Sequence, residues 1–499
     1  MAIRLPFGSL LAPVRRVGAR VGRAKLERYS AAVLFLPLRP SNADWAAVPH
    51  AAVLRELYAR KVRKEGDCCH MRVGARAETL LVAACPPQRT TTFERLTAAG
   101  KLARAVMESE PGSVLLWQSG CAADVAEPVF NAAVAAFQAA AFRLPSFKSK
   151  PKPRTSLARL DIAAAKELPD LDHTLASAAG NNLARWLTAL PPNTLNAAGY
   201  RRLLRQFAQQ LELKLEFYGE GRLRRLGAGA ILAVSQGNAV RDAGIVRLSY
   251  RPRGAAAPAV SLVGKGICFD TGGTNLKPHK SMLDMHTDME GSAVAVGSLY
   301  ALHSLRSPLA VDCWLAITEN RIGPLSYKPQ DVVRAQNGTT IQVIHTDAEG
   351  RMVLADTLCL AARTKPRTII DYATLTGACV YALTERYSGA FTNRPEARDV
   401  IERAGVASGE RVWTFPMDKD FDTEIESNVA DIMQCAIDSK GDHILAARFL
   451  SRFVPKTIPW LHLDLASGTR HGGLAHIHTE ITGFGVRYTL DLLRGGWPG

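Results

Sequence analysis

Two acidic clusters, about sixty residues apart, constrain the fold of this 499-residue chain more than any other feature. The first runs from Gly264 to Asp288 and the second from His345 to Arg351. The first follows an apolar run at 259–263, and the second begins near the end of an alternating segment at 339–346; both patterns are typical of a strand. Open α/β sheets place their ligand sites where strands end, so we expect the two clusters to converge in the folded chain.

Glycines punctuate the start of the first cluster. We expect Gly264 and Gly266 to turn the backbone sharply, which would place Lys265 at the end of the strand, with Asp270 shortly after. Taken alone, a lysine or an aspartate in such a segment is most often a solvated residue or a turn residue. Several of them together indicate a site, because a lysine beside a dication can lose its proton and act as base or ligand.

The rest of the first cluster continues this pattern. The pair Gly272 and Gly273 opens another tight loop, which carries Lys277. Asp288 precedes residues 291–305, where apolar residues at helical spacing predict a helix.

The second cluster places two carboxylates two positions apart. If the extended geometry of 339–346 persists, Asp347 and Glu349 leave the same face of the chain. Two carboxylates that lie so near each other repel unless a proton or a cation lies between them. Arg351 would begin a helix at 351–363, where free amide groups also attract anions. The alternative is a common strand-to-helix turn with an acidic N-cap.

These motifs resemble those of the leucyl aminopeptidases, or cytosol aminopeptidases, which are dinuclear metallo-exopeptidases. Residues 345–351 read His-Thr-Asp-Ala-Glu-Gly-Arg, where the family has Asn at the first position. Residues 264–273 match its Gly-Lys-Gly-x-x-Phe-Asp-[Ser/Thr]-Gly-Gly block. The resemblance extends from about Asn181 to the C-terminus and is closest to bacterial members.

The resemblance implies a site for two divalent metal ions per subunit, Mn²⁺ or Zn²⁺. The implied metal ligands are Lys265, Asp270, Asp288, Asp347 and Glu349. Two catalytic residues are implied: Lys277 would polarise the scissile carbonyl, and Arg351 would hold a bicarbonate ion that shuttles protons. Met285, Thr374 and Leu375 match positions that line the substrate site.

The implied activity is release of N-terminal amino acids, with leucine-like preference, from peptide substrates. Two ions that share one water lower its pKa towards neutrality, so that it can attack the peptide bond. A homohexamer also comes with the resemblance. His345 stands in place of the family's Asn. Its larger side chain would narrow the first substrate subsite, alter the metal preference, or only pack against neighbouring residues without a functional effect. A metal-independent structural paralogue is a further alternative, against which the filled ligand positions argue.

The pattern of elements predicts an α/β protein of two domains. We expect a smaller N-terminal α/β domain at 1–150 with a basic extension at 1–28, a linker and connecting helix at 151–190, and a catalytic domain at 191–499. The catalytic domain should have a mixed central sheet flanked by helices. Predicted strands are 31–38, 79–84, 259–263, 310–317, 339–346, 368–374 and 460–465, and predicted helices include 93–108 and 128–141.

Charge is uneven along the chain. Residues 1–190 hold 27 Lys and Arg against 15 Asp and Glu, whereas the remainder holds 35 against 31. The basic N-terminal part raises the alternative of a DNA-binding accessory protein that retains the peptidase fold. The nine cysteines show no Cys-x-x-Cys spacing, and no apolar run is long enough to span a bilayer. We expect a cytoplasmic protein, with the mitochondrial matrix as the second choice because residues 1–26 contain no acid.

Overall fold

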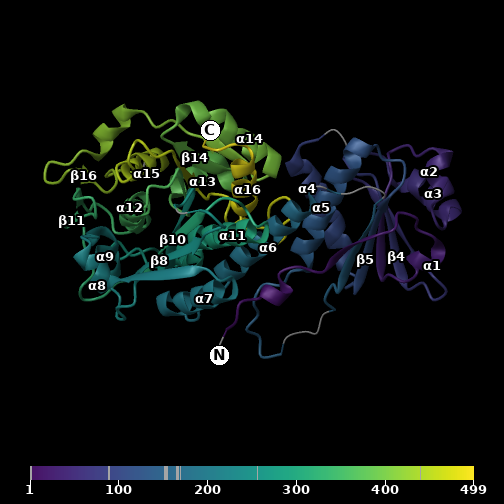
Figure 1. Ribbon diagram of the computed structural model, residues 1–499, viewed down its shortest axis with the longest axis horizontal. Coiled ribbons are helices and arrows are strands. Elements are labelled where there is room, and N and C mark those ends of the chain that lie inside the picture. The colour runs from purple at the N-terminus through teal and green to yellow at the C-terminus, as the bar shows by residue number, and fades with distance from the viewer. Residues whose placement is uncertain are drawn as a thin grey trace. The chain divides into compact units, whose positions relative to one another are not determined.

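The computed structural model describes residues 3–498 except 88–89, 151–154, 165–167, 169, 256 and 439. The chain forms two compact units, and each mixes helices with strands (Figure 1). One comprises Met1–Pro6, Ala179–Arg470 and Ile481–Gly499, and the other Phe7–Ala178 with His471–Glu480. The division between the units, at Ala178 and Ala179, falls inside the predicted linker and connecting helix at 151–190. The domain limits at 150 and 190 therefore stay predictions. Part of the expected linker lies outside the described residues.

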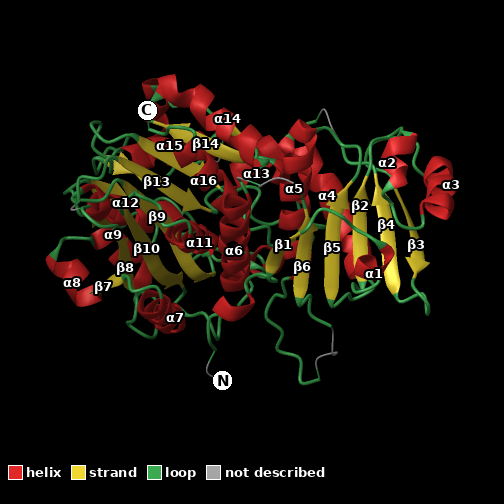
Figure 2. Ribbon diagram, turned by 45° about the vertical axis from the view of Figure 1, so that its right-hand side comes forward, coloured by secondary structure: helices red, strands yellow, loops and turns green. Residues whose placement is uncertain are grey.

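The N-terminal unit is built on a six-stranded sheet, whose strands Figure 2 shows side by side. Only the pair β3–β4 is antiparallel. Strand β2 is buried along its whole length, as expected for a central parallel strand covered on both faces. The strands, in sheet order, are β1 (Val14–Val17), β6 (Arg159–Ala163), β5 (Ser113–Gln118), β2 (Ala31–Phe35), β4 (Thr79–Ala84) and β3 (Cys68–Val73).

Helices α4 (Thr92–Met107) and α5 (Ala123–Ala141) pack against each other in this unit. The predicted strands 31–38 and 79–84 and helices 93–108 and 128–141 are confirmed, with shifts at their ends. Shorter helices are α1 (Arg23–Leu26), α2 (Asn42–Ala46) and α3 (Ala51–Lys61).

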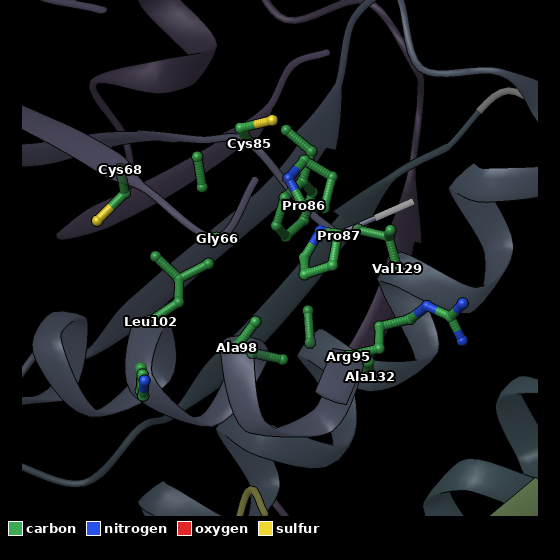
Figure 3. A pocket seen from close by; sticks show the side chains of 15 residues that line it. Gly66, Cys68, Cys85, Pro86, Pro87, Arg95, Ala98, Leu102, Val129 and Ala132 are labelled. Atoms are coloured by element: carbon green, nitrogen blue, oxygen red, sulfur yellow. The ribbon is translucent and has the colours of Figure 1, made fainter. Parts of the chain in front are cut away.

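A small pocket of about 100 Å³ lies in the N-terminal unit. Figure 3 shows Pro86 and Pro87 near one wall, with Arg95, Ala98 and Leu102 contributed by α4. Its lining is mainly apolar.

The larger unit contains the predicted mixed sheet, with eight strands. Its centre is parallel, because β9 pairs in parallel with both β13 and β10, whereas β8 and β14 run antiparallel to their inner neighbours. In sheet order the strands are β15 (Val412–Thr414), β14 (Ser388–Thr392), β17 (Trp460–Asp464), β13 (Thr368–Ala373), β9 (Val260–Asp270), β10 (Val311–Asn320), β8 (Gly244–Tyr250) and β7 (Lys214–Gly219).

Helices cover both faces of this sheet. Gly264 on β9 faces α11 (Glu290–Ser304), and Lys265, one residue on, faces α12 (Glu349–Ala362). The other helices are α6 (Leu171–Thr188), α7 (Ala197–Gln210), α8 (Glu220–Arg225), α9 (Gly229–Ser235), α10 (His279–Met282), α13 (Gly377–Leu383), α14 (Arg398–Ser408), α15 (Asp442–Ser451) and α16 (Val486–Arg494). No described helix meets the length and hydropathy needed to cross a bilayer.

The expected turn at Gly264 and Gly266 is wrong, because β9 runs straight through both glycines to Asp270. A Cβ atom at Gly264 would lie 2.4 Å from the Cα of Ser292 on α11, and one at Gly266 would lie 2.7 Å from the carbonyl oxygen of Ala316. Gly264 therefore permits close packing of α11 on β9, and Gly266 permits the close approach of the backbone of the neighbouring strand, which contains Ala316. Lys265 lies inside the strand and not at its end.

The predicted strand 339–346 is also too long. Only β12 (Thr340–Gln342) is a strand, in a small sheet with β11 (Val332–Arg334) and β16 (Ile432–Met433). The chain then leaves the extended conformation before Asp347, and Glu349 begins α12. The extended Asp347–Glu349 geometry considered from sequence does not occur.

Candidate metal centre

The two acidic clusters converge in the folded chain. Ligand oxygens of Asp270, Asp347 and Glu349 all lie within 4.8 Å of one another. Asp270 ends the central strand β9, Glu349 begins α12, and Asp347 lies in the turn that precedes this helix. This convergence is what the position of the acidic motifs along the chain predicts.

A bulge in β9 brings Asp270 to the side of the sheet that carries Lys265. Lys265 pairs with Ala316 on β10, and Asp270 pairs with Asn320, but β9 contains one more residue than β10 between Ile267 and Asp270. Residues five apart in a regular strand point to opposite faces, and the extra residue reverses that relation. The bulge therefore places both side chains at the same site.

The ammonium group of Lys265 lies between two buried carboxylates. Its Nζ contacts Asp288 Oδ1 at 2.9 Å and Glu349 Oε1 at 2.8 Å, and it donates to the carbonyl oxygen of Thr374 at 3.0 Å. Burial alone would lower the pKa of Lys265, but the neighbouring carboxylates outweigh burial and raise it. Removing one member of such a buried pair typically costs about 3–5 kcal/mol.

Lys277 lies between the other two carboxylates of the cluster. Its Nζ contacts Asp270 Oδ2 at 2.9 Å and Asp347 Oδ1 at 2.5 Å. Its side chain is 14% exposed, so the ammonium is at the wall of the cavity and not in the core. Burial and the nearby Asp270 raise the pKa of Asp347 to about 6.

Hydrogen bonds from β10 and the loop before Asp347 tie the two acidic segments together. Asn320 Nδ2 donates to Asp270 Oδ1 at 2.8 Å and to the carbonyl oxygen of Thr346 at 3.0 Å. The hydroxyl of Thr346 donates to the carbonyl oxygen of Gly272 at 2.6 Å. Gly272 has φ 87°, which a residue with a side chain adopts only with strain.

The donor set fits divalent cations. Glu349 Oε2 and Asp288 Oδ2 are buried, and within the described residues they accept no hydrogen bond. Burial raises the pKa of both carboxyl groups, and the neighbouring carboxylates raise it further although Lys265 acts in the opposite direction. Unpaired buried carboxylate oxygens are costly unless a cation or proton satisfies them, and carboxylates suit Mg²⁺, Mn²⁺ or Zn²⁺.

An open cavity of about 820 Å³ gives access to the cluster. Met285, Thr374 and Leu375, the predicted substrate residues, all line it. Thr374 Oγ1 donates to Asp288 Oδ1 at 2.8 Å, so the wall of the cavity and the acidic cluster are directly joined.

The sequence of the catalytic domain of the cytosol aminopeptidase family matches residues 182–490. The chain belongs to the cytosol aminopeptidase family. It is a metal-dependent aminopeptidase, as its family and the geometry of its acidic cluster agree. The family match gives no support to the alternative of a DNA-binding accessory protein.

Curated relatives and a solved structure match most of this chain. A probable cytosol aminopeptidase of Synechococcus sp. (strain CC9311) is 35% identical over 85% of this chain and 86% of its own length. One of Roseiflexus castenholzii is 38% identical over 71% of this chain and 74% of its own. The bottromycin maturation enzyme BotP, solved in complex with Mn, is 31% identical with a TM-score of 0.80, covering 93% of this chain and 99% of that one.

His345 is where the chain departs from the cytosol aminopeptidase motif. The side chain is exposed in the cavity, and its Nδ1 accepts the backbone N–H of Asp347 at 3.3 Å. Partial burial, with Lys277 and Arg351 nearby, lowers the pKa of the imidazole. His345 therefore faces the cavity and is not packed in the core.

Sequence reasoning missed four residues that shape this site. Asn320 and Asp464 each end a strand that the sequence predicted, and strand ends were the available signal. Asp464 accepts the N–H of Leu375 at 3.1 Å and the hydroxyl of Thr376 at 2.7 Å, which fixes the loop after β13. The other two, Gln434 and Asp442, carry no such signal.

Gln434 and Asp442 contact the second motif. Gln434 is fully buried and its Nε2 donates to the carbonyl oxygen of Ala348 at 3.0 Å, while its Oε1 accepts the N–H of His345 at 3.2 Å. Asp442 Oδ2 accepts from Arg351 Nη2 at 2.7 Å. Arg351, the predicted bicarbonate ligand, thus has a carboxylate partner within the chain.

Proposed function

We propose that the acidic cluster holds two divalent cations and that the enzyme uses them to release N-terminal residues, preferably leucine-like, from peptides. The observation that carries the proposal is the convergence of four carboxylates and two lysines, from segments about sixty residues apart, at the floor of one open cavity. One ion would be held by Lys265, Asp270, Asp288 and Glu349, and the other by Asp270, Asp347 and Glu349.

A pair of cations held there would supply a water of lowered pKa and polarise the scissile carbonyl. Lys277 adds an ammonium donor at the wall of the cavity. A donor fixed beforehand at the place where negative charge develops stabilises the transition state more than the substrate. Its bonds to Asp270 and Asp347 hold the ammonium in position.

The walls of the cavity favour an apolar side chain at the substrate's N-terminus. Met285 and Leu375 are half-buried there, and Val380, Leu465 and Ala466 extend the apolar lining. A leucine-sized group buried against such residues contributes about 1.5–3 kcal/mol relative to its exposure. Leucine and methionine substrates are therefore expected to exceed glycine and aspartate substrates in kcat/KM.

The proposal is tested with a panel of aminoacyl-p-nitroanilides. Metal-free protein is assayed alone, with Mn²⁺, with Zn²⁺ and after addition of chelator, beside a Glu349→Gln variant. We expect hydrolysis of the leucine compound that needs metal, disappears with chelator and is abolished in Glu349→Gln. Full activity in that variant, with its fold shown intact by circular dichroism, would contradict the assignment.

Three finer statements belong to the same proposal. We expect Mn²⁺ or Zn²⁺ as the native ion, which metal analysis of the purified protein would decide. We expect a homohexamer, which light scattering would measure, and a cytoplasmic location, which fractionation of the source cells would test.

A further inference from the structure

Arg351 is a buried cation whose charge is already balanced inside the protein. It is 1% exposed and lies in the first turn of α12. Its Nη2 donates to Asp442 Oδ2 at 2.7 Å, and its Nη1 donates to the carbonyl oxygen of Gln434 at 3.3 Å. Arg351 and Asp442 line the same cavity as the acidic cluster.

This arrangement does not fit a free bicarbonate ion at Arg351. Both terminal nitrogens of the guanidinium have acceptors, and the remaining Nε is buried away from the cavity's solvent. An anion placed there would also lie beside the carboxylate of Asp442, which repels it. Asp442 occupies the first turn of α15, where helix amides favour a negative charge.

Asp442 differs from the other carboxylates that line the described part of the cavity. Four of those belong to the acidic cluster. Asp464 holds the backbone and hydroxyl groups of the loop after β13, and Asp438 is exposed and paired with Lys440 at 3.1 Å. Asp442 lies outside the cluster, is fixed by Arg351, and keeps 23% of its side chain exposed.

We propose that Asp442 replaces an exogenous anion at Arg351 and acts as the enzyme's own proton relay. The inference rests on the proposed aminopeptidase function. The attacking water loses one proton to the carboxylate of Asp442 as its oxygen bonds to the peptide carbon. The same proton then passes to the leaving nitrogen as the C–N bond breaks, so Asp442 ends in its starting state and Arg351 holds it in place throughout.

Two substitutions at Asp442 and one matched control test this role. Asp442→Asn keeps the shape but accepts no proton, and we expect its kcat for leucine-p-nitroanilide to fall about tenfold or more with little change in KM. Asp442→Gly opens the place beside Arg351, and about 50 mM formate or bicarbonate should restore at least part of its activity, as general bases do. Asp438→Asn removes another carboxylate from the cavity lining and should match the wild type.

Anion binding is measured separately from activity. Formate should raise the melting temperature of metal-free Asp442→Gly above a sodium chloride control of equal ionic strength, and should not do so for the wild type. If the wild type binds formate as well as Asp442→Gly does, or if Asp442→Asn retains full kcat, the proposal is overturned. If the wild type lacks peptidase activity with every metal, the proposed function fails, while the melting-temperature comparison still decides whether Asp442 fills the anion site.

Discussion

Binding of divalent cations should release one proton or more at neutral pH, and one of them should come from Lys265. Nζ of Lys265 has three acceptors, Asp288 Oδ1 at 2.9 Å, Glu349 Oε1 at 2.8 Å and the carbonyl oxygen of Thr374 at 3.0 Å. An ammonium has three donors and no lone pair, so it can bind a metal only after losing a proton. The neighbouring carboxylates outweigh burial and raise the pKa of Lys265, which makes that loss depend on pH.

The size of the effect follows from the proton count. Each proton released makes metal binding stronger by about 1.4 kcal/mol, or tenfold in affinity, for every unit by which pH rises. The window from pH 7 to 8.5 is best, because it lies above the pKa of about 6 for Asp347. In this window the carboxyl group of Asp347 is already ionised and contributes little.

Isothermal titration of metal-free protein with MnCl₂ in buffers of different ionisation enthalpy measures the protons released. The slope of the observed enthalpy against the buffer enthalpy should be at least about one for the wild type and smaller by about one for Lys265→Met. Circular dichroism would check that the variant is folded. If the wild type binds Mn²⁺ with no proton released, Lys265 does not become a metal ligand and the reasoning is refuted.

Three further predictions concern stability and the support of the site. Burial raises the pKa of Glu290 to about 8 from an ordinary 4.5. The native state then keeps a proton that the unfolded chain loses, so stability falls between these pH values by up to about 5 kcal/mol. Glu290→Gln should shrink the loss of melting temperature between pH 5 and 8, and an undiminished loss would count against this. Gly264→Val should destabilise the protein by about 1–3 kcal/mol or more, because a Cβ would lie 2.4 Å from Ser292 Cα. Gly377→Ala, with open space around it, is the control in the same thermal melt. Asn320→Ala should weaken Mn²⁺ binding roughly 10–100-fold in a titration while the protein stays folded, and unaltered affinity would show that its hydrogen bonds do not support the site.

The sequence predicted the convergence of Asp270, Asp347 and Glu349 because its signals are local. Asp270 ends a central strand, which is where an α/β sheet collects such side chains, and Asp347 and Glu349 stand in a short motif at the start of a helix that its apolar spacing identifies. Helix 351–363 was likewise expected and is present as α12.

The errors arose where tertiary contacts decide the local structure. The sequence alone does not show whether Gly264 turns the chain or allows a helix to pack closely on the strand. The position of α11 shows that it allows the close packing. The contacts of Arg351 with Gln434 and Asp442 join positions 83 and 91 residues apart. No periodicity marks such pairs. Strand β1 (Val14–Val17) was missed because four residues with two arginines carry little strand signal, and its pairing with β6 supplies the rest.

The bulge in β9 makes the catalytic apparatus sensitive to the length of the chain as well as to its chemistry. Inserting or deleting one residue in the regular part of β9 between Lys265 and Ile267, with the bulge kept, would leave every functional side chain in the sequence, yet it would place Lys265 and Asp270 on opposite faces of the sheet. Variation in this enzyme should therefore tolerate many exchanges of residue type along β9 before it tolerates a single insertion or deletion there.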